Sequence, residues 1–243
     1  MKEHEDAFGR EIYDYFQHGE AIEIVERDDG FLGTSIGPAA YFSQYPDWSS
    51  YQKTALGYVQ GRTLDVGCGA GRFALYLQEQ GYEVVGIDNS PLAIKVCRQR
   101  GVADARVMSV TQASQQKLGR FDSIIMMGNN FGLFGNPRRA KWLLRRLYGM
   151  TPANGRIIAE SNDPYQTDKA YHLDYHKRNR NRGRLPGQLR IRVRYLTYIG
   201  QWMDYLMVSQ EEMQKILAGT GWSISQFINS EGSMYAAVIE KSA

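Results

Sequence analysis

Three glycines in the first third of the chain have the spacing of a loop that brings the backbone close to a ligand. Gly67, Gly69 and Gly71 follow the apolar run Thr63–Val66, which predicts a buried strand, and precede a stretch that predicts a helix. A second apolar run ends in an acid, Asp88. A strand, a glycine turn, a helix and a second strand that closes on an acid form a nucleoside-binding unit.

Two further residues decide which nucleoside this unit suits. Arg72 stands where a dinucleotide fingerprint needs Gly or Ala, and Asp65 lies at the mouth of the loop, where a pyrophosphate would have to sit. A carboxylate there repels phosphate but suits the sulfonium and ammonium charges of S-adenosyl-L-methionine (AdoMet). We therefore expect an AdoMet site in which Asp65 neutralises the ammonium and Asp88 accepts from both ribose hydroxyls. The alternative is a Rossmann-like turn with two incidental acids.

The longer motifs Gly61–Arg72 and Gly86–Pro91 resemble those of class I (Rossmann-like) AdoMet-dependent methyltransferases, and are similar to bacterial members of unassigned substrate. The resemblance covers roughly residues 60–160 and the C-terminal end. It implies an α/β fold with a seven-stranded, mostly parallel sheet, helices on both faces and an antiparallel C-terminal hairpin. It also implies methyl transfer from AdoMet, with S-adenosyl-L-homocysteine as the product, but it does not name the acceptor.

Residues at the ends of the predicted strands complete the expected cofactor site. Met108 and Ser109 end the third strand, where enzymes of this family line the adenine, and Ser109 stands where an acid often lies. Adenine recognition would then rely on backbone groups and on packing of Met108. The predicted cofactor-binding residues are Asp65, Gly67, Cys68, Gly69, Gly71, Arg72, Asp88, Asn89, Met108, Ser109, Met127 and Gly128.

The segment Met127–Asn130 follows the fourth predicted strand, where the transferred methyl and the acceptor should meet. Asn129 or Asn130 would orient the acceptor there, or would only cap the following turn. In-line displacement needs a general base only if the acceptor must lose a proton. The candidate bases are His172, His176, Glu160 and Asp163. Although His172 and His176 have the spacing of a metal pair on a helix, no third ligand has a suitable position, so we expect no metal.

The composition of the 243 residues, 43% hydrophobic and 23% charged, is that of an ordinary soluble protein. No window approaches 18 consecutive apolar residues, and the charged N-terminus lacks the apolar core of a secretory signal. Cys68 and Cys97 lack metal spacing and are expected to be reduced thiols. We therefore predict a cytoplasmic protein, monomeric or homodimeric, without a membrane partner.

Charge is concentrated in one window. Residues 169–194 hold nine basic residues and one acid, a net +8, which leaves 3 − 8 = −5 for the remainder of the chain. Within this window Arg192 and Arg194 alternate with apolar residues, so they should share one face of a strand. This row either binds a carboxylate or phosphate of the acceptor or guards an exposed edge strand against aggregation. The substrate-binding candidates are Tyr41, Asn130, Arg192 and Arg194.

Hydrophobic periodicity predicts the elements that position these residues. Helices are expected at 3–18, 49–60, 72–80, 91–100, 137–148 and 209–218, and residues 20–50 are expected to be irregular. Strands are expected at 63–66, 84–88, 105–110, 121–127, 155–160, 222–228 and 234–240, with a loop at 128–136. Residues 163–208 interrupt the pattern. The first part of this segment has no clear period, and a β-hairpin of 190–195 and 201–208 is expected after it.

These elements predict one structural domain in four parts. They are an N-terminal helical and aromatic cap (1–60), an AdoMet-binding core (61–162), a basic insertion or lid (163–208) and a C-terminal completion of the core (209–243). The favoured function is an AdoMet-dependent methyltransferase acting on a small polar or anionic molecule. The alternatives are an RNA or protein methyltransferase whose insertion binds a polyanion, and a non-enzymatic AdoMet sensor. A nucleic-acid partner is not favoured, because the overall charge is only +3.

Overall fold

The computed structural model describes residues 3–35 and 37–242. Within them, a seven-stranded sheet has the order β11-β12-β7-β6-β3-β4-β5. Its strands are β3 (Thr63–Val66), β4 (Val84–Asp88), β5 (Asp104–Val107), β6 (Ser123–Met126), β7 (Arg156–Asn162), β11 (Trp222–Asn229) and β12 (Met234–Lys241). β3, β4 and β5 are parallel, as are β6 and β7, whereas β12 is antiparallel to both β7 and β11. The predicted α/β class and the antiparallel C-terminal hairpin are confirmed.

A five-stranded sheet has the order β10-β8-β1-β2, with β9 also paired to β8. Its strands are β1 (Ile24–Arg27), β2 (Leu32–Thr34), β8 (Gln188–Tyr195), β9 (Tyr198–Ile199) and β10 (Met203–Leu206). The α-helices are α1 (Ala7–His18), α2 (Ser50–Leu56), α3 (Arg72–Glu79), α4 (Pro91–Gln99), α5 (Gln115–Leu118), α6 (Pro137–Gly149), α7 (Ala170–Asn181) and α8 (Gln210–Leu217). Short 3-10 helices are η1 (Glu3–Glu5), η2 (Pro38–Phe42), η3 (Tyr45–Asp47), η4 (Val110–Gln112) and η5 (Asn130–Phe134). Among the described residues, no helix is both long and apolar enough to span a membrane.

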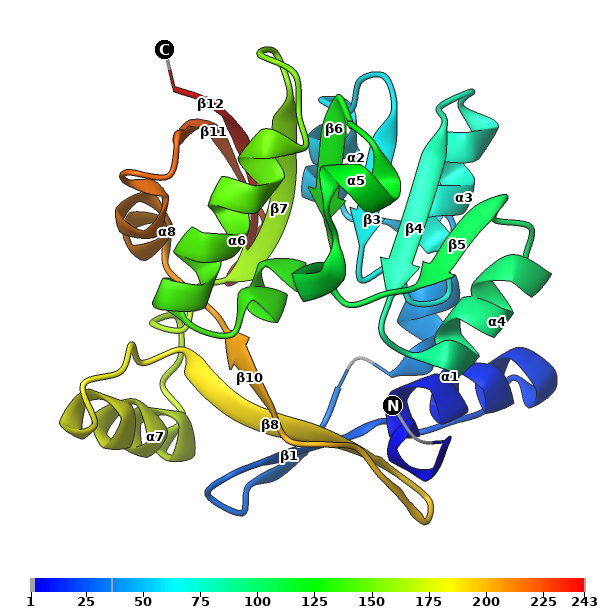
Figure 1. Ribbon diagram of the computed structural model, residues 1–243. Helices are drawn as coiled ribbons and strands as arrows, with labels where there is room; N and C mark the ends of the chain where they lie inside the picture. The colour runs from blue at the N-terminus through cyan, green and yellow to red at the C-terminus, as the bar shows by residue number, and fades with distance from the viewer. Residues whose placement is uncertain (1–2, 36, 243) are drawn as a thin grey trace. The chain divides into compact units, whose positions relative to one another are not determined.

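The chain divides into two compact units, the first of which contains the described parts of residues 1–48, 61–113 and 190–203. All residues of β3 and β4 are buried, as expected for parallel strands covered on both faces. Helix α4 begins as predicted, because the side chain of Ser90 accepts from the Ala93 amide and Pro91 occupies the first helical position. Helix α1 packs alongside α4 (Figure 1).

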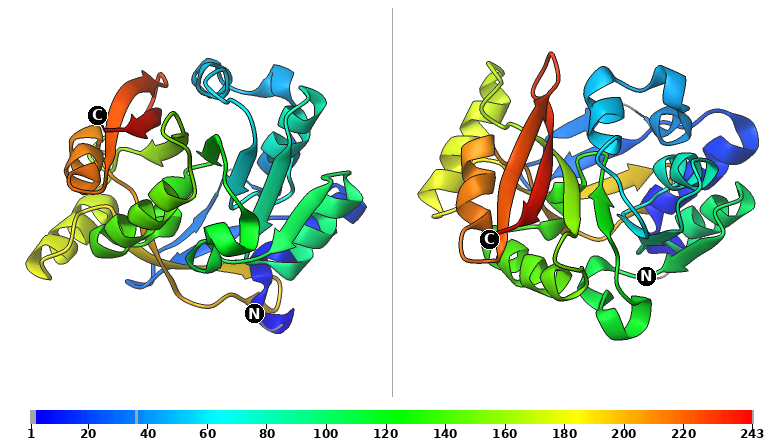
Figure 2. Two further views of the ribbon diagram at one scale, coloured as in Figure 1. Left: turned by 45° about the horizontal axis from the view of Figure 1, so that its top comes forward. Right: turned by 90° about the horizontal axis from the view of Figure 1, so that it is seen from above.

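The second unit contains residues 49–60, 114–189 and 204–243. The C-terminal hairpin β11–β12, red in Figure 2, pairs with β7 through β12. Buried Ile157 and Ile158 place β7 in the core of this unit. Helix α8 opens with the predicted capping box, in which Ser209 and Glu212 exchange side-chain and backbone hydrogen bonds.

Two sequence predictions are wrong because tertiary pairing decides the local structure. Residues 20–50 are not simply irregular, since they contain β1 and β2. Strand β1 pairs with β8, and Glu26 of β1 lies 166 residues from Arg192, its partner on β8. A hydrophobic period within a short window therefore does not predict strand β1. The aperiodic start of the insertion contains a helix, α7, whose buried residues are Tyr175, His176 and Asn179. A helix that buries so few residues has no continuous apolar stripe for the sequence to reveal.

Several predicted boundaries also change. The third strand ends at Val107 rather than at residue 110, because Ser109 caps η4. The predicted loop 128–136 includes η5, and the predicted helix 49–60 is shortened to α2. The second arm of the predicted hairpin divides into β9 and β10, and β9 pairs with β8 directly after a turn at Leu196.

Candidate functional site

The glycine turn after β3 combines space at one glycine with close packing at another. Gly67, Gly69 and Gly71 have positive φ values between 53° and 82°, a region that favours glycine. Among the described residues, a Cβ on Gly69 would meet only Phe8 Cζ within 4 Å, at 3.9 Å. A Cβ on Gly71 would lie 2.7 Å from Cys97 Sγ. Gly69 therefore leaves room for a ligand, whereas Gly71 lets the start of α3 pack against α4.

Two buried carboxylates lie near the ends of the neighbouring strands β3 and β4. Asp65 is 1% exposed and Asp88 is 8% exposed. Asp88 accepts from Ser90 N at Oδ1 (2.9 Å) and from Gly69 N at Oδ2 (3.1 Å). Asp65 Oδ2 is buried and has no hydrogen-bond partner among the described residues. Since an unsatisfied buried carboxylate oxygen is costly, this atom favours a ligand that brings a cation or a donor.

The raised pKa values of Asp65 and Asp88 also favour a positively charged ligand. Burial, followed by the charge of Asp88, raises the pKa of Asp65 to about 7, against the opposing charge of Arg72. Burial raises the pKa of Asp88 to about 6, although backbone amides bonded to its carboxylate lower it. A positively charged ligand favours the ionised forms of both acids. AdoMet fits these residues, because its ammonium and sulfonium are cations and its ribose offers two hydroxyl donors.

Three more of the predicted cofactor residues flank the turn. Cys68 Sγ lies 4.0 Å from Cys97 Sγ, and this hydrogen bond together with burial raises the pKa of the Cys68 thiol. Cys68 is therefore a packed, unreactive thiol. Arg72 Nη1 donates to Ala40 O at 2.9 Å, which directs the guanidinium to the segment after β2. Asn89 is exposed directly after β4.

The predicted adenine-lining residues follow β5. Met108 N donates to Asp88 O at 2.8 Å, which extends the β4–β5 pairing and keeps Met108 beside that residue. Ser109 Oγ accepts from Thr111 N at 3.3 Å, and Ser109 N donates to Gln112 Oε1 at 3.0 Å. The hydroxyl of Ser109 thus stabilises a local turn, and its role toward adenine stays a prediction.

In the second unit, the turn after β6 is held by a buried glutamate. Met127 is 2% exposed, and Gly128 N donates to Glu160 Oε2 at 2.7 Å. The carboxylate of Glu160 also accepts from Tyr51 OH at 2.6 Å and from Gln52 Nε2 at 3.2 Å. Glu160 is a candidate base in the sequence, but these three donors engage it, so its geometry is that of a residue that positions Gly128.

Asn129 combines two unusual features directly after this turn. Its φ is +65°, a left-handed conformation uncommon outside glycine. Its Oδ1 is buried without a hydrogen-bond partner among the described residues. Its carbonyl accepts from Tyr205 OH at 2.6 Å, and the Tyr205 ring lies where a Cβ on Gly132 would collide with it. Asn130 begins η5. No sequence pattern indicates Tyr205, because its partner is a backbone carbonyl, which any residue type provides.

The remaining candidate bases have partners of their own. His172 Nδ1 lies 3.0 Å from Thr167 Oγ1, and the buried ring of His176 lies 6.3 Å from the ring of Tyr165. Asp163 accepts from the Tyr165 amide at 3.0 Å. The described residues contain no group of three or more His, Cys, Asp or Glu side chains that would hold a metal ion.

The arginine row of β8 has an acid on the neighbouring strand. Glu26 of β1 accepts from Arg192 Nε at 2.6 Å and from its Nη2 at 3.1 Å, and it also pairs with Arg194. These hydrogen bonds lower the pKa of Glu26 to about 2. The Arg192 guanidinium also lies 4.4 Å from the centroid of the Trp202 ring. Because β8 pairs with β1 along this row, the alternative of a guarded edge strand is wrong.

Tyr41, another predicted substrate residue, connects the helix α1 to a buried acid. Its ring packs edge-on against Phe8 with centroids 5.4 Å apart. Its hydroxyl donates to Glu23 Oε2 at 3.3 Å. Tyr41 thus lies beside the aromatic residue that faces the glycine turn.

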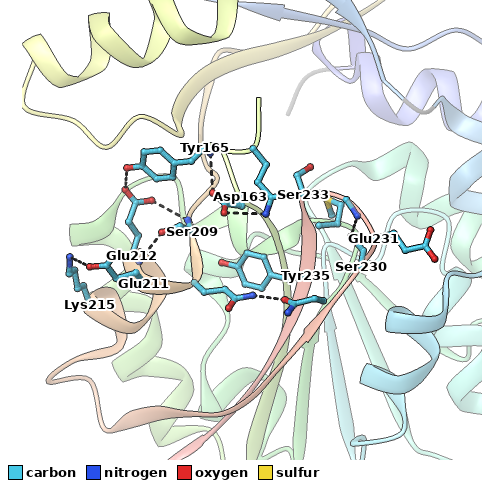
Figure 3. Close-up of a pocket in the computed structure, with 15 residues that line it drawn as sticks. Asp163, Tyr165, Ser209, Glu211, Glu212, Lys215, Ser230, Glu231, Ser233 and Tyr235 are labelled. Carbon is cyan, nitrogen blue, oxygen red and sulfur yellow. Dashed lines mark hydrogen bonds and ion pairs between the residues drawn. The ribbon is translucent and has the colours of Figure 1, made fainter. Parts of the chain in front are cut away.

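A pocket of about 800 Å³ in the second unit is a different feature (Figure 3). Its charged side chains bind one another: Tyr165 OH donates to Glu212 Oε1 at 2.7 Å, and Lys215 Nζ lies 2.7 Å from Glu211 Oε1. None of the predicted cofactor residues is among those that line it. This pocket is therefore not the cofactor site.

Residues 63–155 match a known family, the methyltransferase domain. Over 82 residues the chain is 34% identical to a ubiquinone biosynthesis O-methyltransferase of Xanthomonas oryzae pv. oryzae, a match that covers 32% of this chain and 34% of the relative. The chain thus spans about a third of the length of such curated relatives.

Solved structures extend the likeness beyond this domain. A SAM-dependent methyltransferase from Bacteroides fragilis, in complex with S-adenosyl-L-homocysteine, is 25% identical with a TM-score of 0.84, and the match covers 100% of this chain and 98% of that one. The CcbJ methyltransferase from Streptomyces caelestis shares the fold at 14% identity, with a TM-score of 0.65 and 98% of each chain covered. Residues 63–155, from β3 to the residue before β7, thus match a methyltransferase domain, and the likeness of fold to a SAM-dependent methyltransferase spans the whole chain.

Proposed function

We propose that the protein transfers a methyl group from AdoMet to a small polar molecule. The observation that carries the proposal is the buried Oδ2 of Asp65, which has no partner among the described residues and lies in the strand that leads into the glycine turn. Such an atom suits the ammonium of AdoMet. The second buried acid, Asp88, suits the ribose, because a carboxylate accepts from two hydroxyls at once.

AdoMet supplies an activated methyl carbon for in-line displacement. The residues of this chain would orient the two reactants and exclude water, which supplies most of the acceleration when the reacting atoms are well aligned. Asn129 is our candidate for orienting the acceptor, since its buried Oδ1 has no hydrogen-bond partner among the described residues. An amide oxygen is an acceptor that suits a hydroxyl or an amine of the methyl acceptor. A left-handed residue is strained, and such strain often accompanies function.

The names of two relatives support a small acceptor. One is the ubiquinone biosynthesis O-methyltransferase, and another, 28% identical over 106 residues, is a glycine/sarcosine/dimethylglycine N-methyltransferase of Actinopolyspora halophila. The arginine row gives less support to an anionic acceptor than the sequence suggests, because Glu26 offsets part of its charge.

The second candidate is an RNA or protein methyltransferase that binds a polyanion through its basic insertion. The observation that favours it is the exposed set of cations on and beside α7. These are Lys169, Lys177, Arg180 and Arg182. A salt titration of binding to a mixed RNA pool separates the two candidates, because polyanion contacts give a steep loss of affinity with salt. A flat titration would leave the small-molecule proposal standing alone.

The cofactor assignment is tested by titration calorimetry of AdoMet on the wild type and on Asp88→Ala. Losing a charge-assisted hydrogen bond weakens binding by about 1.5–3 kcal/mol, or roughly tenfold or more. Asp168→Ala, at an exposed position, is the control and should bind like the wild type. A folded Asp88→Ala variant with unchanged affinity would remove Asp88 from the site. Turnover of labelled AdoMet with fractionated metabolite pools then identifies the acceptor.

A further inference from the structure

Helix α1 begins at an aspartate that binds two helices at once. Asp6 is 2% exposed, and its Oδ1 accepts from Gly9 N at 3.0 Å, as an ordinary N-cap does. Its Oδ2 accepts from Ser90 Oγ at 2.9 Å and from Leu92 N at 3.1 Å. These two partners lie at the start of α4, so one carboxylate caps α1 and joins it to α4.

The hydrogen bonds continue from this carboxylate to the cofactor turn. Ser90 binds Asp6 through its hydroxyl and donates its own amide to Asp88 Oδ1 at 2.9 Å. Asp88 Oδ2 in turn accepts from Gly69 N at 3.1 Å. A continuous chain of four residues therefore leads from α1, through the predicted ribose carboxylate, to the glycine that leaves room for the ligand.

The packing of α1 leaves little freedom at this contact. A Cβ on Gly9 would collide with Ser90 Oγ and lie 2.5 Å from Asp6 Oδ2. One turn further on, Ile12 belongs to a buried cluster with Ala70 of the glycine turn and two residues of α4. Helix α1 is thus held against both the turn and the start of α4, as its position beside α4 in Figure 1 shows.

We propose that α1 is a positioning element of the cofactor site, in which Asp6 and the close approach of Gly9 to Ser90 fix the Asp88 carboxylate for the ribose. This inference rests on the proposed function, because it assigns the ribose to Asp88. An N-cap that served only its own helix would leave the cofactor unaffected. A positioning role makes AdoMet binding and the docking of α1 stabilise each other, since coupling between two sites is reciprocal.

The first test replaces Asp6 by a shorter cap. Asp6→Ser keeps a side chain that can cap α1, but serine is too short to bridge to Ser90 and Leu92 as well. The matched control is Asn136→Ser, which exchanges the N-cap of α6 in the same way. By calorimetry with AdoMet we expect Asp6→Ser to bind about tenfold more weakly, the effect of losing hydrogen bonds to a buried carboxylate, and Asn136→Ser to bind like the wild type.

The second test moves α1 without changing any charge. Gly9→Ala adds the colliding Cβ, whereas Gly149→Ala adds a Cβ at the end of α6 where no described atom lies within 4 Å. Both changes raise helix propensity, so a weaker AdoMet complex confined to Gly9→Ala isolates the position of α1. In the wild type, AdoMet should also slow amide hydrogen exchange across residues 7–18, and Gly9→Ala should lose this protection.

Far-UV circular dichroism and thermal unfolding establish that each variant is folded. If Gly9→Ala does not fold, Asp6→Ser decides the question alone. Wild-type affinity in a folded Asp6→Ser variant, without protection of residues 7–18 by AdoMet, would overturn the inference while leaving the cofactor assignment intact. If the wild type itself does not bind AdoMet, the proposed function fails instead, so the two failures are distinguishable.

Discussion

The replacement Glu11→Gln should stabilise the protein at neutral pH, which is the reverse of the usual effect of changing a buried residue. Glu11 lies on α1, is 0% exposed, and has neither carboxyl oxygen bonded to a donor among the described residues. Burial, followed by a hydrogen bond and repulsion from Glu23, raises the pKa of Glu11 from 4.5 to about 11. Glu23, 4% exposed, also accepts from Tyr41 OH.

The magnitude follows from linkage between folding and protonation. At pH 7 the folded protein keeps a proton on Glu11, whereas the unfolded chain releases it. Each pH unit above 4.5 therefore costs the folded state about 1.4 kcal/mol, or roughly 3 kcal/mol at pH 7. The sign is that of an acid with a raised pKa: stability is highest below 4.5 and falls as the pH rises toward 11. Glutamine has the shape of the protonated acid and donates to Glu23 without this cost.

The assay is urea unfolding, followed by circular dichroism, of wild type and Glu11→Gln between pH 5 and pH 8. The two proteins should be nearly equally stable at the acidic end, and the advantage of the variant should grow with each pH unit. Glu20→Gln, at an exposed position, serves as the control and should follow the wild type. Parallel pH curves for wild type and Glu11→Gln would refute the reasoning, because they would mean that Glu11 ionises in the folded state as it does in the unfolded chain.

Three further outcomes are expected. AdoMet affinity should rise between about pH 5 and pH 7 as Asp65 and Asp88 ionise, and fall above about pH 8 as the ligand's ammonium deprotonates; calorimetry showing no pH dependence would contradict binding of the ammonium by an ionised Asp65 and of the ribose hydroxyls by an ionised Asp88. Arg192→Ala should lower the thermal midpoint at pH 7 but much less near pH 2, because Glu26 contributes only while ionised; equal losses at both pH values would mean that the arginine acts by packing alone. Glu160→Gln should lower the free energy of unfolding by about 1–3 kcal/mol, since an amide group would face donors that need an acceptor; unchanged urea stability would contradict its role in holding the turn.

The part of the site that sequence analysis predicted is the part with a local signature. Glycines at alternate positions, an acid before them and an acid at the end of the next strand all lie within one βαβ unit, so their spacing alone fixes their relation. The buried strands β3 and β4 are apolar runs, and α4 and α8 carry caps at their first residues. In each case the residues that determine the structure are neighbours along the chain.

The residues that escaped prediction bind backbone groups or distant partners. Asp6 binds the amide of Leu92, and Tyr205 binds the carbonyl of Asn129, groups that every residue type presents. Helix α7 has no apolar stripe, and its buried Asn179 donates from the side chain to the carbonyls of Pro186 and of Gln188, the first residue of β8. Such contacts are specified by the fold as a whole, so no pattern within a short window reveals them.

The arginines of β8 show how this difference bears on function. Counted within residues 169–194, they belong to a window of net +8, and their alternation suggests a row open to an anion. The acid that pairs with Arg192 and Arg194 is Glu26, which lies on another strand and outside that window. The local excess of charge therefore overstates the field that an acceptor meets at β8. If an anionic partner exists, the exposed cations of α7 are better placed to attract it, because they lie at the surface while the β8 pair is already engaged.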